Sequence, residues 1–462
     1  MSDIKNATVD AEVLARLKKD IDSNDIKYVI PSYVDMHGIP KCKMVPIEYL
    51  ERAMGGSELF TGAALDGVPQ NMADDEVGAV PDPDSFMPIP WRKDVGWFAS
   101  DLWYQGAPFE PCNRGILKRV LQRAQKLGLI VNCGIEAEFF VFNDDGAPIP
   151  NAVSSLPTLA KPAYDSARLM DNLDSWLADT VDAMNELGWS VYSFDHEDGV
   201  GQFELDFQYA DALTMADRFI FLRLMINEFA RKHGCYASFM PKPFADKAGS
   251  GAHFNMSIAD SKTGKNLFEP SGEDGDKHGY GLSPMGYHFT AGVMEHLPAI
   301  LALCAPTVNS YKRLIMKGST SGYTWAPCFT SWGGNNRSNT VRVPSGGGRI
   351  ELRAADSACN PYLGMALMIA AGLKGIENEL EVSSPNTVNL FEQSEEYRQS
   401  KGIAWLPRTL EEAIDALEGD ALSREVLGDA MLASWVEHKR DEWQEFSNHV
   451  SQWERDRYLR MF

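Results

Sequence analysis

The segment Cys133-Gly-Ile-Glu-Ala-Glu-Phe-Phe-Val-Phe142 decides how the rest of the chain is interpreted. Side chains alternate across a β-strand, so Glu136 and Glu138 point to the same face. A Glu-x-Glu pair usually faces solvent, but the residues around this pair are too apolar for an exposed edge. The segment therefore predicts a buried strand with two carboxylates on one face.

Three other segments repeat this alternation of polar and apolar residues. The polar rows are Gln202, Glu204 and Asp206, with Glu197 one loop earlier; His253, Asn255 and Ser257; and Arg349, Glu351 and Arg353. If the rows share one cavity, carboxylates ~4 Å apart repel by about 4 kcal/mol at an effective dielectric near 20. Protonation or divalent cations must relieve that repulsion, and oxygen-rich ligands favour Mg²⁺ or Mn²⁺ over zinc. Periodicity alone leaves open whether the rows meet.

The sequence around these strands predicts an α+β protein of two domains, since 462 residues exceed one compact core. A helix is expected over residues 1–20, followed to about Asp101 by short apolar runs broken by turn residues, as in a small β-rich domain. Asn113 is the expected N-cap of a helix that Gly128 ends, which places the domains at 1–110 and 111–462. Further helices are expected over 212–232, 285–303, 363–380 and much of the last sixty residues.

Composition and charge exclude several classes of function. The net charge of −22 repels phosphate backbones and anionic lipids, so neither nucleic acid nor a membrane is an expected partner. No signal sequence is visible, and no apolar run approaches the ~20 residues of a membrane helix. The seven cysteines are scattered without a C-x-x-C pair. They are typical of reduced thiols in a cytoplasmic protein.

The sequence also lacks the common nucleotide-binding motifs. Neither the phosphate loop G-x-x-x-x-G-K-[ST] nor a strand–G-x-G-x-x-G–helix unit is present. Gly346-Gly347-Gly348 is better explained as a tight turn. Nucleotide phosphates would then be bound by metal ions and arginines, for which Arg337, Arg342 and Arg349 are the candidates.

Six motifs in a fixed order give the chain a resemblance to the glutamine synthetase family along nearly its whole length. They are Gly134–Phe139; Gly201–Glu204; Gly249–His253 with Ser257; Asn309–Leu314; Asn336–Ser338 with Arg342–Pro344; and Ile350–Arg353 leading to Asn360–Leu363. Each motif alone is weak evidence, whereas the ordered set is strong. The resemblance implies a β-grasp-like N-terminal domain and a larger catalytic domain in which an antiparallel sheet and helices form a funnel. It also implies homo-oligomeric rings, typically dodecamers, with active sites between subunits.

Site residues follow from the resemblance, motif by motif. It implies that Glu138, Glu197 and Glu204 bind one metal ion, and Glu136, His253 and Glu351 another, with two or three Mg²⁺ or Mn²⁺ ions per site. It further implies that Arg337 and Arg342 bind the transferred phosphate; that Arg349, Ser257 and Asn255 lie on the ATP side; and that Arg313, Arg353 and Gly249 bind glutamate. The implied reaction joins L-glutamate to a small amine through γ-glutamyl phosphate, which forms at the expense of ATP.

Three departures from the family pattern bear on the amine. Thr61 replaces the acid that holds ammonium, with Asp66 close enough in sequence to compensate; Trp325 replaces the acid of the flap before Ala326-Pro327; and Asn255 replaces a second histidine. Fewer anions weaken ammonium binding, whereas an indole offers an apolar wall and a cation–π face to an alkylammonium. This version resembles the γ-glutamylmethylamide synthetase branch of the family, so methylamine is the expected acceptor.

Other functions remain open at this point. An ordinary glutamine synthetase that uses ammonia is the nearest alternative, followed by ligases for ethanolamine, polyamines or aromatic amines. A catalytically inactive relative would have no reason to keep all six presumed metal ligands. A metal-dependent hydrolase would not explain the segments Asn309–Leu314 and Asn336–Ser338.

Overall fold

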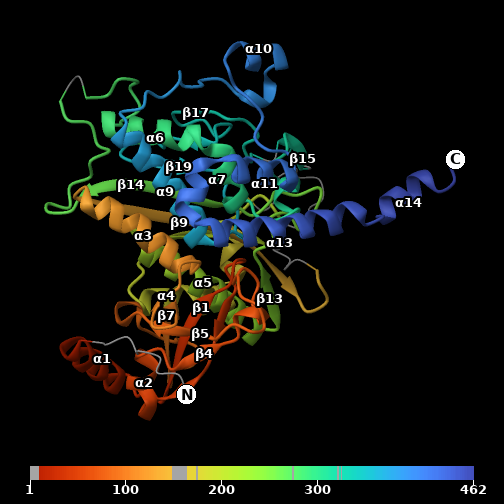
Figure 1. Ribbon diagram of the computed structural model, residues 1–462. Coiled ribbons are helices and arrows are strands. Elements are labelled where there is room, and N and C mark those ends of the chain that lie inside the picture. Colours follow the sequence, from red (N-terminus) through yellow and green to blue (C-terminus); the bar gives the residue numbers. More distant parts are fainter. Residues whose placement is uncertain (1–9, 148–163, 173–174, 273–274, 320–321, 324) are drawn as a thin grey trace.

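The computed structural model describes residues 10–147, 164–172, 175–272, 275–319, 322–323 and 325–462. Two large sheets organise these residues, one formed by the N-terminal part of the chain and one by the remainder (Figure 1). A separate two-stranded ribbon consists of β15 (Lys317–Ser319) and β16 (Gly322–Tyr323). None of the described helices combines the length and the apolarity that crossing a bilayer requires.

The N-terminal sheet is built on two long parallel neighbours, β1 (Tyr28–Val34) and β7 (Val95–Tyr104). Its other strands pair antiparallel: β2 (Pro40–Cys42), β3 (Val45–Pro46), β4 (Glu58–Phe60), β5 (Val77–Pro81), β6 (Met87–Pro88) and β8 (Ala107–Pro108). The main order is β2-β1-β7-β5-β4. Helix α1 (Ala11–Ser23) buries Leu17 and Ile21 in a cluster with Val29 and Phe98, and α2 (Leu50–Met54) adds to the same cluster.

The second sheet has β9 (Leu129–Asn143) as its organising strand, as the sequence predicts for this apolar segment. Its other strands are β10 (Val191–His196), β11 (Gln202–Phe207), β12 (Ala210–Asp211), β13 (Cys235–Ser238), β14 (Ala252–Asp260), β17 (Trp332–Gly333), β18 (Val341–Arg342) and β19 (Ile350–Leu352). The order is β10-β11-β9-β14-β19-β18-β17, with β12 and β13 also paired to β9. The expected antiparallel pattern holds except at β17 and β18, which run parallel.

Most of the other described elements are helices, several of which pack against this sheet. These helices are α3 (Asn113–Lys126), α4 (Trp176–Glu186), α5 (Ala212–Lys232), α6 (Pro284–Glu295), α7 (Leu297–Cys304), α8 (Ser310–Arg313), α9 (Pro361–Glu377), α10 (Glu395–Ser400), α11 (Leu410–Gly419), α12 (Ala421–Leu427), α13 (Asp429–Asn448) and α14 (Gln452–Tyr458). Asn360 caps α9 by accepting a hydrogen bond from the Tyr362 amide, and Pro361 fits its first turn. Helices α13 and α14 extend away from the body toward the C-terminus (Figure 1).

Two glycines let α6 and α9 touch backbone to backbone. A Cβ at Gly292 would lie 2.0 Å from the carbonyl oxygen of Ala371, and one at Gly375 would lie 2.0 Å from that of His288. Neither position could hold a side chain without separating the helices. Because α9 is buried along most of its length, this close approach packs α6 and α9 together in the core of the protein.

The structure corrects two helix predictions. The segment 285–303 forms two helices, α6 and α7, which are separated at His296; Pro298 lies in the first turn of α7, where a proline is tolerated, but it could not continue α6. The N-cap of α3 is Cys112, whose Sγ accepts from the amide of Gly115. Asn113 instead donates from Nδ2 to the Val34 carbonyl at 3.0 Å, which ties α3 to the N-terminal sheet.

The two sheets share no strand among the described residues. The first ends with β8 at Pro108, and the next element, α3, begins at Asn113. We therefore propose 1–110 and 111–462 as the two domains. The helix expected over residues 1–20 is α1, Ala11–Ser23, with 1–9 outside the described part.

Candidate active site

The four polar rows predicted from the sequence lie on adjacent strands β11, β9, β14 and β19. Strand register brings them together: Glu204 stands opposite Glu138, and His253 stands opposite Glu136. Directly opposite side chains on antiparallel strands have Cβ atoms about 4.5–5.5 Å apart. The rows therefore form one continuous polar surface, a convergence that periodicity had left open.

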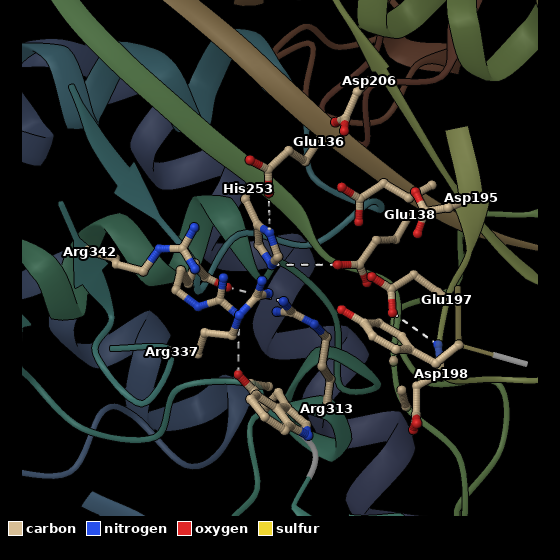
Figure 2. Close-up of a pocket in the computed structure, with 17 residues that line it drawn as sticks. Glu136, Glu138, Asp195, Glu197, Asp198, Asp206, His253, Arg313, Arg337 and Arg342 are labelled. Atoms are coloured by element: carbon tan, nitrogen blue, oxygen red, sulfur yellow. Dashed lines mark hydrogen bonds and ion pairs between the residues drawn. The ribbon is translucent and has the colours of Figure 1, made fainter. Parts of the chain in front are cut away.

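This surface lines a cavity of about 450 Å³. Figure 2 shows carboxylates along one side, the guanidinium groups of Arg313, Arg337 and Arg342 along the other, and His253 between them. The lining residues are Glu136, Glu138, Tyr164, Asp195, Glu197, Asp198, Glu204, Asp206, Ala248, Gly249, His253, Arg313, Trp325, Ala326, Arg337, Arg342 and Arg353. A site with both signs of charge can bind an anionic substrate beside cations.

Glu136, His253 and Glu351 form one compact group of ligand atoms. Nδ1 of His253 lies 2.9 Å from Oε2 of Glu136 and 3.5 Å from Oε1 of Glu351. Glu351 is fully buried and also pairs with two arginines, at 2.5 Å to Nε of Arg342 and 2.7 Å to Nη1 of Arg353. Glu351 thus fixes both guanidinium groups at the edge of the cavity.

Glu138, Glu197 and Glu204 form a second group. Oε2 of Glu138 accepts from the amide of Gly251 at 2.7 Å and from Nε2 of Gln202 at 3.4 Å. Oε2 of Glu197 accepts from the amide of Asp198 at 2.9 Å. Backbone amides and one buried amide side chain therefore hold the carboxylates of Glu138 and Glu197 in place, although the carboxylates of this group repel one another.

Burial and crowding disturb the ionisation of this acidic surface. Burial, reinforced by Glu138, raises the pKa of Glu197 to about 8 and that of Glu204 well above its usual value. Burial and Glu136 raise the pKa of Asp206 to about 7, and burial and Asp165 raise that of Asp195 to about 6. Burial is also the largest influence on Glu136 and opposes its ionisation, but the hydrogen bonds from His253 and Asn255 and the nearby positive charges of His253 and Arg353 together outweigh burial and lower its pKa to about 2.

Both groups suit a divalent cation. Their donors are five carboxylates and one imidazole, a set that favours Mg²⁺ or Mn²⁺. Oε2 of Glu351 faces a charged partner but accepts no hydrogen bond from the described residues, so a lone pair remains for a cation. The raised pKa values mark carboxylates that lack sufficient positive charge nearby, which bound cations would supply.

Thermal stability without divalent cations is expected to fall as the pH rises. The folded protein keeps Glu197 and Asp206 protonated up to pKa values of about 8 and 7, whereas the unfolded chain ionises such groups near pH ~4. Between those values the folded state binds more protons, so stability decreases from about pH 5 to about pH 8. The lowered pKa of Glu136 acts only below about pH 4.5.

Melting curves of chelator-treated protein at several pH values check this expectation. Adding Mg²⁺ should raise the midpoint temperature of unfolding, and the rise should be larger at about pH 8 than at about pH 5.5. Glu197→Gln should flatten the pH dependence, because the substitution removes one of the two carboxylates. An increment that is equal at both pH values would contradict this electrostatic interpretation.

The three residues predicted to bind glutamate, Gly249, Arg313 and Arg353, line the first cavity. Arg313 is buried and donates to the carbonyl oxygens of Ala354 and Arg353, both at 3.1 Å. Gly249 is required beside it, since a Cβ there would lie 2.4 Å from the Pro241 carbonyl oxygen and 2.9 Å from Cγ of Arg313. Arg353 also donates to the carbonyl of Trp325 at 3.4 Å. These arginines are held in place before any substrate binds.

A second cavity of about 510 Å³ adjoins the first. Asn255, Ser257 and Arg349 line it, while Glu136 and Asp206 line both cavities. Gly346, Gly347 and Gly348 all have positive φ, which confirms the tight turn expected there and brings Arg349 to the rim. The three residues predicted for the ATP side are therefore together, next to the acidic surface.

Trp325 lines the first cavity, whereas Thr61 lines neither cavity within one chain. Trp325 is 45% exposed and has a φ of 60°, a left-handed conformation that is unusual for a bulky residue. Such a backbone persists only where its surroundings hold it, which is common at functional sites. Thr61 lies after β4 on the exposed surface of the N-terminal sheet.

Several lining residues were not predicted as site residues. Asp195 could have been found, because Ser193 and Asp195 on β10 and Glu197 just after it continue the alternation. Asp206 was placed in a polar row but was not assigned a role. Tyr164 carries no local signal in the sequence, since it follows a run of small and apolar residues and reaches the cavity only through the fold.

Known proteins resemble this chain over most of its length. Residues 110–458 match the family described as glutamine synthetase, catalytic domain. The glutamate–methylamine ligase of Methyloversatilis universalis is 40% identical over 95% of this chain and 97% of its own. The glutamine synthetase of Rhizobium leguminosarum bv. phaseoli is 39% identical over 98% of this chain and 99% of its own.

A solved structure described as a GmaS/ADP complex superimposes with a TM-score of 0.87 at 37% identity, covering 96% of this chain and 99% of that one. The family relationship expected from six ordered motifs is therefore confirmed. The chain belongs to the glutamine synthetase family.

Proposed function

We propose that the chain is a carbon–nitrogen ligase that joins methylamine to the γ-carboxylate of L-glutamate at the expense of ATP. The observation that carries this proposal is the junction of the two cavities at Glu136 and Asp206. ATP in the second cavity can direct its γ-phosphate toward the acidic surface. Glutamate in the first cavity then lies between the carboxylates and the arginines (Figure 2).

Each side chain has a role that its position supports. Glu136, His253 and Glu351 would hold one divalent cation and Glu138, Glu197 and Glu204 another, while Asp195 and Asp206 line the same cavity. Bound cations neutralise negative charge on the transferred phosphoryl group. Arg337 and Arg342 donate hydrogen bonds to the same group, and Arg313 and Arg353 orient glutamate through its carboxylates.

The reaction has two steps. A γ-carboxylate oxygen of glutamate attacks the γ-phosphorus of ATP, ADP leaves, and γ-glutamyl phosphate forms. The neutral amine then attacks the carbonyl carbon of γ-glutamyl phosphate, the bond between that carbon and the phosphate oxygen breaks, and the amine nitrogen loses a proton. The fixed guanidinium groups stabilise charge on both departing phosphates without having to reorganise.

Methylamine is favoured over ammonia by the residue at the flap and by similarity to known proteins. Trp325 offers an apolar wall and an aromatic face where the family has an acid. Glutamate–methylamine ligase, at 40% identity, and the GmaS structure, at a TM-score of 0.87, support the same acceptor. One methyl group is worth only about 1–3 kcal/mol in such a pocket, so some activity with ammonia is expected.

A comparison of amines tests the proposal. Purified enzyme with ATP, Mg²⁺ and glutamate should release phosphate faster with methylamine than with ammonia at equal concentration, and mass spectrometry should find γ-glutamylmethylamide. Faster release with ammonia would identify an ordinary glutamine synthetase. A faster rate with ethanolamine or a polyamine would assign the enzyme to another γ-glutamyl ligase.

Replacing Trp325 with alanine is expected to reduce the preference for methylamine. Loss of the indole removes the apolar contact with the methyl group, so the ratio of kcat/KM for methylamine to that for ammonia should fall about tenfold. Trp405→Ala is the matched control, because Trp405 is similarly exposed but lines neither cavity. If both variants changed the ratio equally, Trp325 would not be the residue that selects the amine.

The assembly and the location are also proposed. A mixed sheet with a parallel central pair and α1 across it suits a β-grasp-like N-terminal domain. The exposed apolar residues Trp453, Leu459, Met461 and Phe462 favour burial against other copies in a homo-oligomer, a dodecameric ring by resemblance. There Thr61 of one subunit can reach the cavity of its neighbour.

The seven free thiols fit a reducing compartment, the cytoplasm.

A further inference from the structure

Consecutive hydrogen bonds connect residues that line the second cavity to residues that line the first. Nε of Arg349 donates to Oδ1 of Asn255 at 3.1 Å, and Nδ2 of Asn255 donates to Oε1 of Glu136 at 2.9 Å. The other oxygen of Glu136 lies 2.9 Å from Nδ1 of His253. These hydrogen bonds therefore connect a guanidinium group in the second cavity to the carboxylate and imidazole of a candidate cation site.

The chemistry of the partners fixes the orientation of the Asn255 amide. Arginine can only donate, and an ionised carboxylate can only accept, so the amide oxygen must face Arg349 and the NH₂ group must face Glu136. A flipped amide would bring two donors together at one end and two acceptors at the other. The amide dipole is thus aligned between a positive and a negative charge, which strengthens both bonds.

The backbone holds Asn255 where it can reach both partners. On β14 it stands opposite Gly134 of β9 and opposite Glu351 of β19. Gly134 has no side chain, so β9 contributes no side chain opposite Asn255 at this position. Ser257, the next residue on the same face, lines the same cavity, but the hydrogen bonds of the described residues join it to neither Arg349 nor Glu136.

We propose that Asn255 is a positioning residue that couples nucleotide binding to cation binding. This inference rests on the proposed function, because it takes the second cavity as the nucleotide site. A cation held by Glu136 would fix that carboxylate, and through two hydrogen bonds it would fix Asn255 and Arg349. A nucleotide would then find the guanidinium group already ordered, and less ordering cost would oppose its binding.

Adenosine and Mn²⁺ test this coupling. Adenosine carries no phosphate and cannot bind the ion through one, so any mutual effect must pass through the protein. Saturating Mn²⁺ should tighten adenosine binding, measured by equilibrium dialysis, by a factor on the order of five to ten. Adenosine should tighten Mn²⁺ binding at one site, measured by electron paramagnetic resonance of the free ion, by the same factor.

Asn255→Leu is the decisive variant, since it removes both hydrogen bonds at similar volume. Each ligand should still bind, but the coupling factor should fall to about one. Ser257→Ala is the matched control: it should weaken adenosine binding and keep the coupling factor. Independent binding in the unaltered enzyme, or coupling that survives Asn255→Leu, would overturn the inference and leave the proposed function standing. Failure of both ligands to bind the unaltered enzyme would overturn the proposed function as well.

Discussion

An enzyme in which glutamine replaces Glu351 is expected to lose ligase activity by a factor on the order of 10² to 10³. Glu351 is fully buried, lies 3.5 Å from His253, and pairs with Arg342 and Arg353 at 2.5 and 2.7 Å. Glutamine has nearly the same shape but no charge. Both guanidinium groups would lose their ionic partner, and one ligand of the candidate cation site would weaken.

The measurement is kcat with saturating ATP, glutamate, methylamine and Mg²⁺, together with the thermal midpoint of the variant. Glu381→Gln provides the same chemical change in an exposed pair with Lys277, where little effect is expected. Mn²⁺ titration should find weaker binding at one site in Glu351→Gln. A folded Glu351→Gln enzyme with nearly full activity would remove Glu351 from the mechanism.

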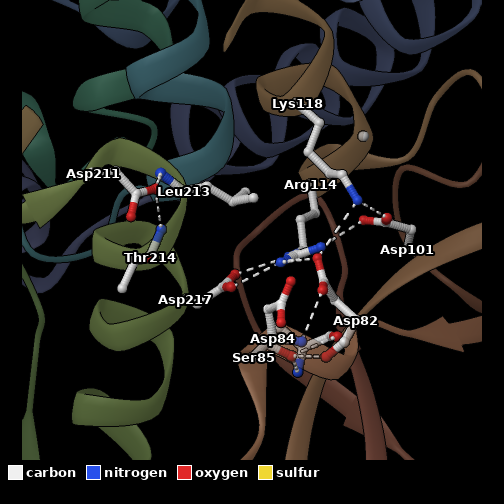
Figure 3. Close-up of polar contacts among 12 residues, drawn as sticks. Asp82, Asp84, Ser85, Asp101, Arg114, Lys118, Asp211, Leu213, Thr214 and Asp217 are labelled. Atoms are coloured by element: carbon white, nitrogen blue, oxygen red, sulfur yellow. Dashed lines mark hydrogen bonds and ion pairs between the residues drawn. The ribbon is translucent and has the colours of Figure 1, made fainter. Parts of the chain in front are cut away.

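Replacing Arg114 with methionine is expected to lower the free energy of unfolding by about 3–5 kcal/mol. Arg114 lies at the centre of a buried ionic network (Figure 3). Its guanidinium group forms two bonds of 2.9 Å to Asp217 and one of 3.0 Å to Asp101, and it lies 2.9 Å from Asp82. Asp82 and Asp101 belong to the N-terminal sheet region and Asp217 to α5, so one side chain joins the two proposed domains.

Without Arg114 the carboxylates would face one another with Lys118 as the remaining cation of this network. Burial already raises the pKa of Asp217 even though Arg114 is beside it, so the unpaired carboxylate would be costly. The unfolding midpoint in urea, at fixed protein concentration, measures the effect. Adding Asp217→Asn should recover part of the loss.

Arg16→Met is the control for Arg114→Met. Arg16 pairs with Asp84 at 2.5 Å, but their side chains are 59% and 79% exposed. Its loss should change stability by less than about 0.5 kcal/mol. Equal shifts for the two variants would mean that the buried network contributes no more than an exposed ion pair.

The sequence predicted the faces of the strands better than their arrangement. The alternation in residues 133–142 and 201–207 identifies which side chains share a face, because the period of a strand is fixed by its geometry. The alternation does not say which strands pair with one another. That Glu204 lies opposite Glu138, and His253 opposite Glu136, follows from pairing between distant segments. Only the resemblance to a family supplied this knowledge in advance.

Local signals failed where a residue serves a distant partner. Asn113 has the chemistry of an N-cap, yet its amide binds the Val34 carbonyl and Cys112 takes over the cap. Pro298 lies in the first turn of α7, but the apolar residues over 285–303 favoured the prediction of a single helix. Tyr164 reaches the cavity from a segment whose sequence has no distinctive pattern. Tertiary contacts decide the roles of such residues, and no local sequence pattern predicts those contacts.

The central claim is that phosphoryl transfer from ATP activates the γ-carboxylate of glutamate beside Glu136, Glu138 and His253. Glutamate labelled with ¹⁸O in both γ-carboxylate oxygens tests it most directly. The enzyme, given ATP, Mg²⁺ and methylamine, should release phosphate that carries one ¹⁸O atom and leave the other in the amide. Phosphate without the label, formed at the same rate as the amide, would contradict the account.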